Sequence, residues 1–432
     1  MTSGHDVPLR ARNGIDALTD ATAWRWIQLA LGIACMVAIA NLQYGWTLFI
    51  RPIDEKYGWG LPALQLTFTI AVATETFLGV PFGGRLVDRF GPSIVWVSGL
   101  LIAFAWYINS LADSLMLFYV AAVIAGLGTG LVFAAAYGNA LKWFPDRRGL
   151  AAGLTAAGFA GGGVVTVVAL SNMIKSSGYE AAYLWFGLGQ GLVLVASALL
   201  LRAPRPAAGV VSVPAQMPPR AHQYALGEVL RSQPFWLMYA MFVMVAAGGL
   251  TLQAQLAPIA TDLGFDKVLV SILGITMLTP VLAVSFNQVT NGLSRPFFGW
   301  VSDWFGRERT MFVAFLLESV AFLAVIFLAD TPVGFVLVAG LVFFAWGEIF
   351  SLFPAICTDT YGSRFASRNY GMLYTAKGVA SLLVPLASVL KDTTGSWTGV
   401  FAAAAALNFI AALLALVLQS ALARRREKSP TA

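Results

Sequence analysis

Two cationic side chains, Arg295 and Lys377, lie within long apolar stretches of this sequence. Arg295 precedes Asp303, at the polar end of its stretch, by eight residues, and Lys377 follows Arg368 by nine. At a helical rise of about 1.5 Å per residue, each cation lies roughly 12–14 Å deep, near the middle of a bilayer core about 30 Å thick. A charge at that depth is costly and marks a functional site by default. Arginine offers a planar fork to a carboxylate and lysine a compact second charge, so the pair predicts a site for a small anion.

Aromatic and amide side chains occur at the same depth as the two cations. They are Gln43, Tyr44, Trp46, Phe49, Trp346, Phe350 and Tyr374. Each one alone favours helix packing or an interfacial aromatic belt over contact with a ligand. Together they suit a small planar anion, because rings can cover its faces while hydroxyl and amide groups bind its oxygens. A site closed by bulky rings predicts a ligand of few atoms.

The elements that must position these residues are membrane-spanning helices. The 432 residues are 58% hydrophobic and only 11% charged, whereas soluble domains carry about 25% charged residues. A spanning helix needs roughly 20 mostly apolar residues, and the sequence predicts twelve such spans. They lie near 25–49, 62–84, 93–111, 115–141, 148–173, 181–201, 233–258, 268–301, 310–329, 333–355, 366–390 and 396–420. The predicted fold class is an all-α membrane protein, with the lipid bilayer as its surroundings.

The arginines and lysines are distributed unequally between the two sides of the predicted membrane. Of the 27 cations, twenty lie on the side that carries both termini, five lie on the other side, and Arg295 and Lys377 lie within spans. Cytoplasmic loops carry the excess of positive charge. The sequence therefore predicts a multi-pass protein of the bacterial inner membrane with both termini in the cytoplasm.

A loop pattern occurs twice and divides the chain into two repeats. The segment 84–91 recurs at 299–306, with its glycines and its aspartate at an offset of 215 residues. Such parallel repeats predict two pseudo-symmetric six-helix bundles, 1–201 and 233–432, joined by a Pro-rich cytoplasmic linker, 202–232. The pattern resembles the conserved cytoplasmic loop motif of the major facilitator superfamily. Its glycines allow a tight turn and its aspartate can accept hydrogen bonds from an arginine, which predicts a conformational latch of Gly84, Asp88, Arg89, Gly299, Asp303 and Arg307.

The repeat comparison bears on whether the two buried cations serve the fold or a ligand. Arg295 aligns with Val80, and Lys377 aligns with Ala157, so the fold does not demand a cation at either place. The alternative is that each cation reaches the interface or pairs with an acid inside the membrane. Acids available for such pairing are Glu75, Glu318 and Glu348. Of these, Glu75 and Glu348 are also candidates for proton coupling, because either could be protonated with the substrate or could neutralise Lys377.

Several other classes of function are not supported by the sequence. The glycine-rich segments 126–130 and 158–163 lead to no Gly-Lys-Ser/Thr, so they predict close helix packing rather than nucleotide binding. His5 and His222 lie outside the spans, and no catalytic triad or metal-ligand cluster is evident. The basic residues are dispersed among loops, unlike those of a nucleic-acid-binding domain. We therefore expect no enzyme activity, no cofactor, no metal and no nucleic-acid partner, and we expect a monomer.

Longer motifs resemble the oxalate:formate antiporter family of the major facilitator superfamily. They are Gln43-Tyr44-x-Trp46, Trp143-Phe-Pro-Asp-Arg-Arg-Gly149, Arg295-Pro-Phe, Phe344-x-Trp346-Gly, Leu352-Phe-Pro, Ser367-Arg-Asn-Tyr-Gly371 and Ala376-Lys377. The resemblance implies that Arg295 and Lys377 hold a dicarboxylate, and that Gln43, Tyr44 and Trp346 line its pocket. The chain departs from the family's oxalate carriers in three ways. They have a tyrosine at the position of Phe350, a tryptophan at that of Tyr374, and no carboxylate in span two.

The resemblance and the two cations together predict a secondary transporter that exchanges oxalate, formate or a similar small carboxylate by alternating access. An empty site with two unneutralised cations would be expensive to close without water, which would make exchange obligatory. Two alternatives stay open. One is proton-coupled symport of a lactate-like monocarboxylate through Glu75 or Glu348, and the other is a sensor or assembly partner that keeps the fold without moving solute.

Overall fold

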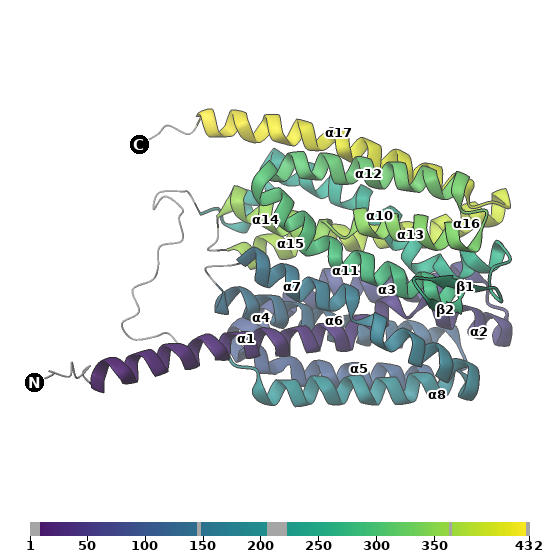
Figure 1. The fold of residues 1–432 in the computed structure, drawn as a ribbon, viewed down its shortest axis with the longest axis horizontal. Coiled ribbons are helices and arrows are strands. Elements are labelled where there is room, and N and C mark those ends of the chain that lie inside the picture. The colour runs from purple at the N-terminus through teal and green to yellow at the C-terminus, as the bar shows by residue number, and fades with distance from the viewer. Residues whose placement is uncertain (1–8, 145–147, 205–222, 363–364, 429–432) are drawn as a thin grey trace, which may run out of the picture.

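A computed structural model describes residues 9–144, 148–204, 223–362 and 365–428. Long helices run side by side along the molecule (Figure 1). The described starts and ends of the chain, at α1 and α17, lie at one end of the bundle, which we call the terminal end (Figure 1). The short strands β1 and β2 lie at the opposite end, which we call the hairpin end (Figure 1). His5, His222 and most of the predicted linker lie outside the described residues.

The first half of the chain folds into helices joined by short turns. Its elements are α1 (Leu9–Tyr44), α2 (Thr47–Tyr57), α3 (Leu61–Thr74), the π-helical turn η1 (Glu75–Gly79), α4 (Val80–Phe90), the 3₁₀ turn η2 (Pro92–Ile94), α5 (Val95–Leu111), α6 (Leu115–Trp143), α7 (Arg148–Gly161) and α8 (Gly163–Leu200). The backbone of α8 is interrupted at Gly178, where φ is 85° and ψ is 162°. Because glycine adopts this conformation without a steric penalty, the chain can reverse there and begin a further span.

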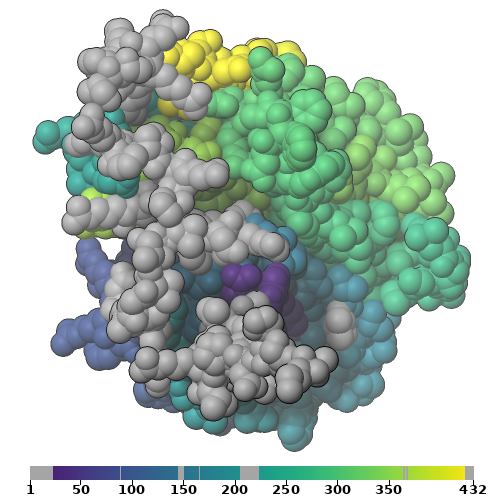
Figure 2. Space-filling model, turned by 60° about the vertical axis from the view of Figure 1, so that its left-hand side comes forward, coloured from purple at the N-terminus to yellow at the C-terminus, as the bar shows by residue number. Residues whose placement is uncertain are grey.

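The second half of the chain is also mostly helical, and in Figure 2 its green and yellow atoms lie above the purple and blue atoms of the first half. Its elements are α9 (Leu226–Leu230), α10 (Gln233–Asp262), β1 (Leu269–Ile272), β2 (Ile275–Leu278), α11 (Thr279–Phe305), α12 (Arg307–Leu328), α13 (Pro332–Trp346), α14 (Ile349–Tyr361), α15 (Ala366–Ser381), α16 (Leu383–Thr394) and α17 (Thr398–Lys428).

The expectation of an all-α membrane protein is confirmed. Ten stretches of the described chain are long and apolar enough to cross a membrane. One of them, Leu150–Leu200, contains two predicted spans on either side of Gly178. The predicted span around Arg295 is not among the ten, because α11 carries many polar residues, yet it is a helix of 27 residues. The twelve predicted segments thus all contain helix.

The predicted span 268–301 is wrong at its start. Residues 269–278 form an antiparallel hairpin in which Leu269 pairs with Leu278 and Ile272 with Ile275. Leu273 and Gly274 connect the strands with φ values of 53° and 80°, as a two-residue hairpin turn requires. An apolar run with β-branched residues can form a short strand as well as a helix. Here the turn at Leu273 and Gly274 favours two paired strands over a helix.

Small residues bring the two halves close together along their contact. Gly292 on α11 lies against Gly161 on α7, and a Cβ added to it would lie 3.3 Å from the Gly161 nitrogen. A Cβ on Gly378 of α15 would collide with the hydroxyl of Thr76 in η1. Since small residues let helices in a membrane approach closely, these contacts bring η1, α7, α11 and α15 together around one central region.

Candidate functional site

Interruptions in three helices surround the central region where the two halves meet. α1 ends at Tyr44 and two residues separate it from α2, while α13 ends at Trp346 and two residues separate it from α14. In the helix α3–η1–α4, the π-helical turn begins at Glu75. π-turns are often found at functional sites, and discontinuous helices form the central binding sites of many transporters. Near these interruptions, Gln43, Tyr44 and Glu75 contact residues of the second half, while Trp346 packs against Phe350 within the second half.

The guanidinium of Arg295 is fully buried on α11. Its Nη1 donates to the Ala156 carbonyl at 2.8 Å, and its Nη2 donates to the Tyr44 hydroxyl at 3.2 Å. Its Nε donates to Asn291 Oδ1 at 3.2 Å, and its Cζ lies 4.2 Å from the centroid of the Phe350 ring. Within the described chain no carboxylate pairs with Arg295. It is therefore a fixed, buried positive charge without a counter-ion of its own.

The ammonium group of Lys377 has a different environment. It is fully buried on α15 and lies 3.1 Å from Oε1 of Glu75, whose side chain is 3% exposed. It also donates to Gln43 Oε1 at 3.0 Å and to the Tyr374 hydroxyl at 3.1 Å. The Tyr374 hydroxyl in turn donates to the same Glu75 oxygen at 3.2 Å. Lys377 is thus neutralised by a carboxylate from the opposite half of the protein.

Aromatic rings separate the two cations and cover them. The ring of Phe350 lies against Arg295 and is also 5.8 Å from Lys377 Nζ. Phe133 and Phe159, at 5.8 and 5.7 Å from the same nitrogen, complete an aromatic wall. Aromatic faces stabilise nearby cations. The rings also keep the region dry, which strengthens the electrostatic interactions inside it.

One expectation about the charges is corrected by this geometry. The sequence predicts two cations without counter-ions in the empty site. In the structure, however, Glu75 forms an ion pair with Lys377. The alternative that an intramembrane acid pairs with a cation therefore holds for Lys377 and not for Arg295. The sequence could not decide this, because only the approach of η1 to α15 brings the two groups together. Closing the empty site requires burial of one net positive charge rather than two.

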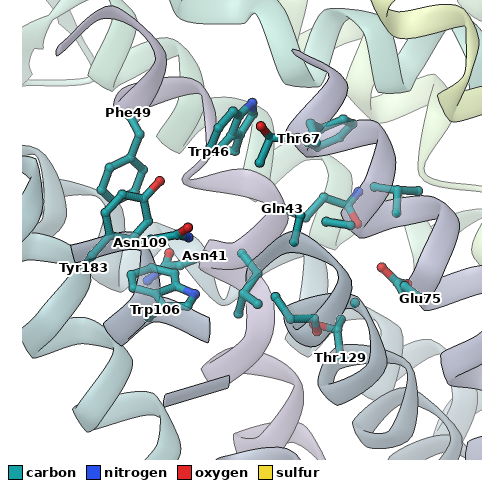
Figure 3. Close-up of a pocket in the computed structure, with 17 residues that line it drawn as sticks. Asn41, Gln43, Trp46, Phe49, Thr67, Glu75, Trp106, Asn109, Thr129 and Tyr183 are labelled. Carbon is teal, nitrogen blue, oxygen red and sulfur yellow. The ribbon is translucent and has the colours of Figure 1, made fainter. Parts of the chain in front are cut away.

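The other predicted residues divide into those near the cations and those elsewhere. Trp346 is buried and packs edge-on against Phe350, with ring centroids 5.4 Å apart. Trp46 and Phe49 instead line a cavity inside the first half of the chain (Figure 3). Glu348 is fully buried, and neither of its carboxyl oxygens has a partner in the part of the chain that the structure describes. The structure does not bring Glu348 to Lys377.

Several residues of the site were missed by the sequence reasoning. They are Phe133, Ala156, Phe159, Gln253 and Asn291. Asn291 could have been found, since it precedes Arg295 by one helical turn and their side chains must meet. Gln253, which accepts a hydrogen bond from Gln43 at 3.1 Å, gave no such signal. It comes from α10, and only packing places it there.

The cavity beside the central site lies between α1, α3, α5, α6 and α8. Its volume is about 50 Å³, and Glu75 and Gln43 form part of its wall. Figure 3 shows Glu75 on one side of it and Asn109 and Tyr183 on the opposite side. Glu75 thus faces both Lys377 and this cavity.

The predicted latch residues lie at the terminal end of the bundle. Arg307 forms ion pairs with Asp303 at 2.7 Å and with Asp359 at 3.3 Å, and it also donates to Ser302. All four residues belong to the second half, so these contacts tie α11, α12 and α14 to one another. In the first copy the Arg89 guanidinium lies 5.2 Å from the centroid of the neighbouring Phe90 ring.

The two glycines of the predicted latch have space around them. Gly84 has open space around it, and Gly299 lies near Ser351, whose Cβ would be 3.8 Å from an added Cβ. The side chain of Asp88 lies outside the described residues.

Polar contacts between the halves also close the hairpin end. Arg51 of α2 pairs with Asp266, which follows α10, at 2.6 Å. Deeper inside, Gln65 of α3 donates to the Ala254 carbonyl at 2.9 Å, and Thr69 donates to the Ser381 carbonyl at 2.8 Å. Among the described residues there is no group of three or more side chains that could hold a metal ion.

Comparison with known proteins relates this geometry to a family. The family model of the Major Facilitator Superfamily matches residues 31–286 and 257–432. The chain is 34% identical over 395 residues to the oxalate:formate antiporter of Oxalobacter formigenes, covering 90% of each protein. It is 31% identical over 405 residues to an uncharacterized 38 kDa protein of Thermoproteus tenax, covering 93% of the chain and 98% of that protein. It is also 26% identical over 404 residues to human monocarboxylate transporter 11, covering 88% and 79%.

Proposed function

Because the chain belongs to the oxalate:formate antiporter family of the major facilitator superfamily, we propose that it exchanges small carboxylates across a membrane by alternating access. The observation that carries the proposal is the buried guanidinium of Arg295, which has no carboxylate partner among the described residues. A buried charge of this kind is retained where a ligand supplies the counter-ion. The two halves, 1–201 and 233–432, are proposed to rock about it, without any enzymatic step.

The geometry of Arg295 suits one end of a carboxylate. Arginine has five N–H donors, and three hydrogen bonds to Tyr44, Asn291 and Ala156 orient the group. The Tyr137 hydroxyl is a further hydrogen-bonding neighbour of the guanidinium. A carboxylate can bind the remaining donors beside it, while the ring of Phe350 lies against the guanidinium. An ion contact at about 4 Å contributes roughly 4 kcal/mol at an effective dielectric constant of 20, before the cost of desolvation is deducted.

Lys377 is proposed to bind the other end of the ligand, and Glu75 to compete for the same ammonium group. In this structure Oε1 of Glu75 lies 3.1 Å from the ammonium nitrogen of Lys377. An incoming dianion can take over this contact, since it brings its own negative charge between the two cations. Glu75 must then move away or become protonated, because like charges at close range repel.

The membrane orientation is also part of the proposal. Twenty Lys and Arg residues belong to the side that carries the termini, and the described ends of α1 and α17 lie together at the terminal end (Figure 1). By the positive-inside rule, the terminal end faces the cytoplasm of a bacterial inner membrane and the hairpin end faces outward.

The proposal is tested by uptake of labelled oxalate into proteoliposomes preloaded with oxalate, with formate or with buffer alone. We expect rapid uptake only when an internal anion is present, with both oxalate and formate effective. Saturable oxalate binding without any flux would indicate a sensor instead. Equal uptake into empty and preloaded vesicles would contradict exchange.

A second candidate function is proton-coupled symport of a monocarboxylate, and the ion pair between Lys377 and Glu75 favours it. An empty carrier with this ion pair can reorient without exposing Lys377 as an unpaired charge to the dry interface. Protonation of Glu75 would free Lys377 for a single carboxylate, so that one proton and one anion move together. Entry of lactate or acetate driven by an inward proton gradient, without internal anion, would establish it.

Opening of the hairpin end should become easier when Asp266 is replaced by asparagine. The hydrogen bond from Arg51 holds the pKa of Asp266 below its usual value. Asp266 therefore stays ionised at neutral pH, and the contribution of the ion pair to closure is lost as the pH falls through that lowered pKa. Because the pair is exposed, we expect only an about twofold to fivefold shift toward the open state.

This shift can be measured as the alkylation rate of a cysteine placed at Thr69, in a background free of other cysteines. Asp262→Asn is the matched control, because Asp262 pairs with Lys391 at 2.8 Å within the second half alone. Asp266→Asn should raise the alkylation rate at neutral pH, and the difference from the parent should shrink in acid. An equal effect of Asp262→Asn would show that the contact between the halves is not responsible.

A further inference from the structure

The cavity inside the first half has an unusual lining for the interior of a helix bundle. Asn41, Trp46, Thr67, Asn109 and Tyr183 contribute to its wall and are between 1% and 8% exposed. Each has one polar atom without a hydrogen-bond partner in the described chain: Asn41 Nδ2, Trp46 Nε1, Thr67 Oγ1, Asn109 Oδ1 and Tyr183 Oη. Buried polar groups are normally satisfied by protein or by ordered water. These five atoms therefore indicate an occupant with both donors and acceptors.

Water fits this cavity better than a second anion does. A buried water needs about 10–15 Å³ of such volume and two to four polar partners. The cavity of about 50 Å³ can therefore hold a short row of waters. The charged residue in its wall is Glu75, and a carboxylate repels an anion. The lining also mixes donors with acceptors, as waters require.

Such a row of waters would run between two different parts of the protein. One end is Glu75, near the middle of the membrane, and Figure 3 shows Asn109 and Tyr183 at the other. Asn109 lies two residues before the end of α5. Tyr183 follows the chain reversal at Gly178 by five residues and packs edge-on against Tyr179 at 6.3 Å. The far end therefore lies toward the hairpin end of the bundle.

A charged surface pair lies beyond the tyrosines. The ammonium of Lys56 lies 5.4 Å from the centroid of the Tyr179 ring and pairs with Glu180 at 2.7 Å. Both charged side chains are substantially exposed. Tyr179 and Tyr183 thus lie between the cavity and this exposed pair.

We propose that waters in this cavity form a proton path between Glu75 and the hairpin end, separate from the route of the substrate. The inference rests on the second candidate function, proton-coupled symport, and deepens it by assigning a path for the coupled proton. A proton enters from bulk solvent, each water passes one proton to the next, and a new O–H bond forms on Glu75. The carboxylate becomes neutral, and the ammonium of Lys377 loses its ion pair and is free to bind the anion.

The groups that face Glu75 make its protonation responsive to the substrate. Lys377 and Tyr374, both on α15, contact its carboxylate, and Arg295 on α11 and Tyr44 on α1 act on this charge cluster from a greater distance. An anion bound between the cations opposes the ionised form of Glu75 and so draws a proton to it. Glu75, Arg295 and Lys377 are at most 2% exposed, so a proton must reach Glu75 through the interior, and the cavity is a space that Glu75 lines.

Two variants test the path without touching the substrate site. Ala122 lines the cavity, so Ala122→Leu fills it with apolar atoms, and Ala122→Ser is the matched control. Tyr183→Phe removes one hydroxyl at the far end. We expect proton-driven net uptake of a monocarboxylate to fall about tenfold in Ala122→Leu and less in Tyr183→Phe, with anion exchange at symmetrical pH within about twofold of the parent. Ala122→Ser should match the parent in both assays.

The two assays distinguish failure of this inference from failure of the proposed function. Exchange at symmetrical pH reports the function and the correct assembly of each variant in the same vesicles. Proton-driven uptake that persists in both variants would overturn the path. The same holds if the parent exchanges anions but shows no proton-driven uptake, or if Ala122→Leu slows both processes equally. Loss of exchange in the parent would overturn the proposed function itself.

Discussion

Replacing Arg295 by alanine should lower the rate of oxalate exchange by at least about a hundredfold, since two charge-assisted hydrogen bonds to the substrate contribute about 1.5–3 kcal/mol each. Arg295 is the buried cation that lacks a carboxylate partner in the described chain. Its removal takes away the charge that the substrate neutralises. The measurement is counterflow of labelled oxalate into oxalate-loaded proteoliposomes.

Arg295→Lys is the informative control for this prediction. It keeps a positive charge but cannot reproduce the fork that Tyr44 and Asn291 orient. We expect exchange between that of the parent and that of Arg295→Ala, with weaker oxalate binding. Thermal stabilisation by oxalate should be lost in Arg295→Ala even where the purified protein remains folded. Exchange within about tenfold of the parent in Arg295→Ala would contradict the assignment.

Replacing Glu75 by glutamine should turn the protein into a stricter exchanger. Lys377 would then lack its ion partner whenever the site is empty, and burial of an unpaired ammonium costs several kcal/mol. We therefore expect net efflux into anion-free medium to fall by about tenfold to a hundredfold relative to exchange, since about 1.4 kcal/mol corresponds to a factor of ten. Net uptake should also lose its response to a proton gradient. The measurement is the ratio of net efflux to exchange in the same vesicle preparation.

Glu318→Gln is the matched control, because Glu318 is also a fully buried glutamate. It lies on α12, where Asn408 donates to it at 3.3 Å, and it has no contact with Lys377. It should leave the ratio of net efflux to exchange unchanged. An unchanged ratio in Glu75→Gln would show that the ion pair does not control reorientation of the empty carrier.

The fold class and the two cations of the proposed site could be predicted from the amino-acid sequence. The length of the apolar segments and the scarcity of charge allow little besides a helical membrane protein, because backbone groups in lipid must be satisfied within each segment. The depth of Arg295 and Lys377 followed from counting residues to Asp303 and Arg368 along a regular helix. Both are local properties of the chain. They need no knowledge of which helices become neighbours.

The groups that face each cation could not be predicted, because they depend on how distant helices pack together. Glu75 and Lys377 are 302 residues apart in the chain and 3.1 Å apart in space, and no pattern in either segment predicts that contact. The same holds for Trp46, which was grouped with the ligand-binding residues but lines the cavity of the first half. It holds also for the hairpin 269–278, where a two-residue turn replaced the predicted start of a span. Charge pairing between distant helices depends on the packing of the whole bundle, so the sequence located the charges while the fold determined which of them remains free for a ligand.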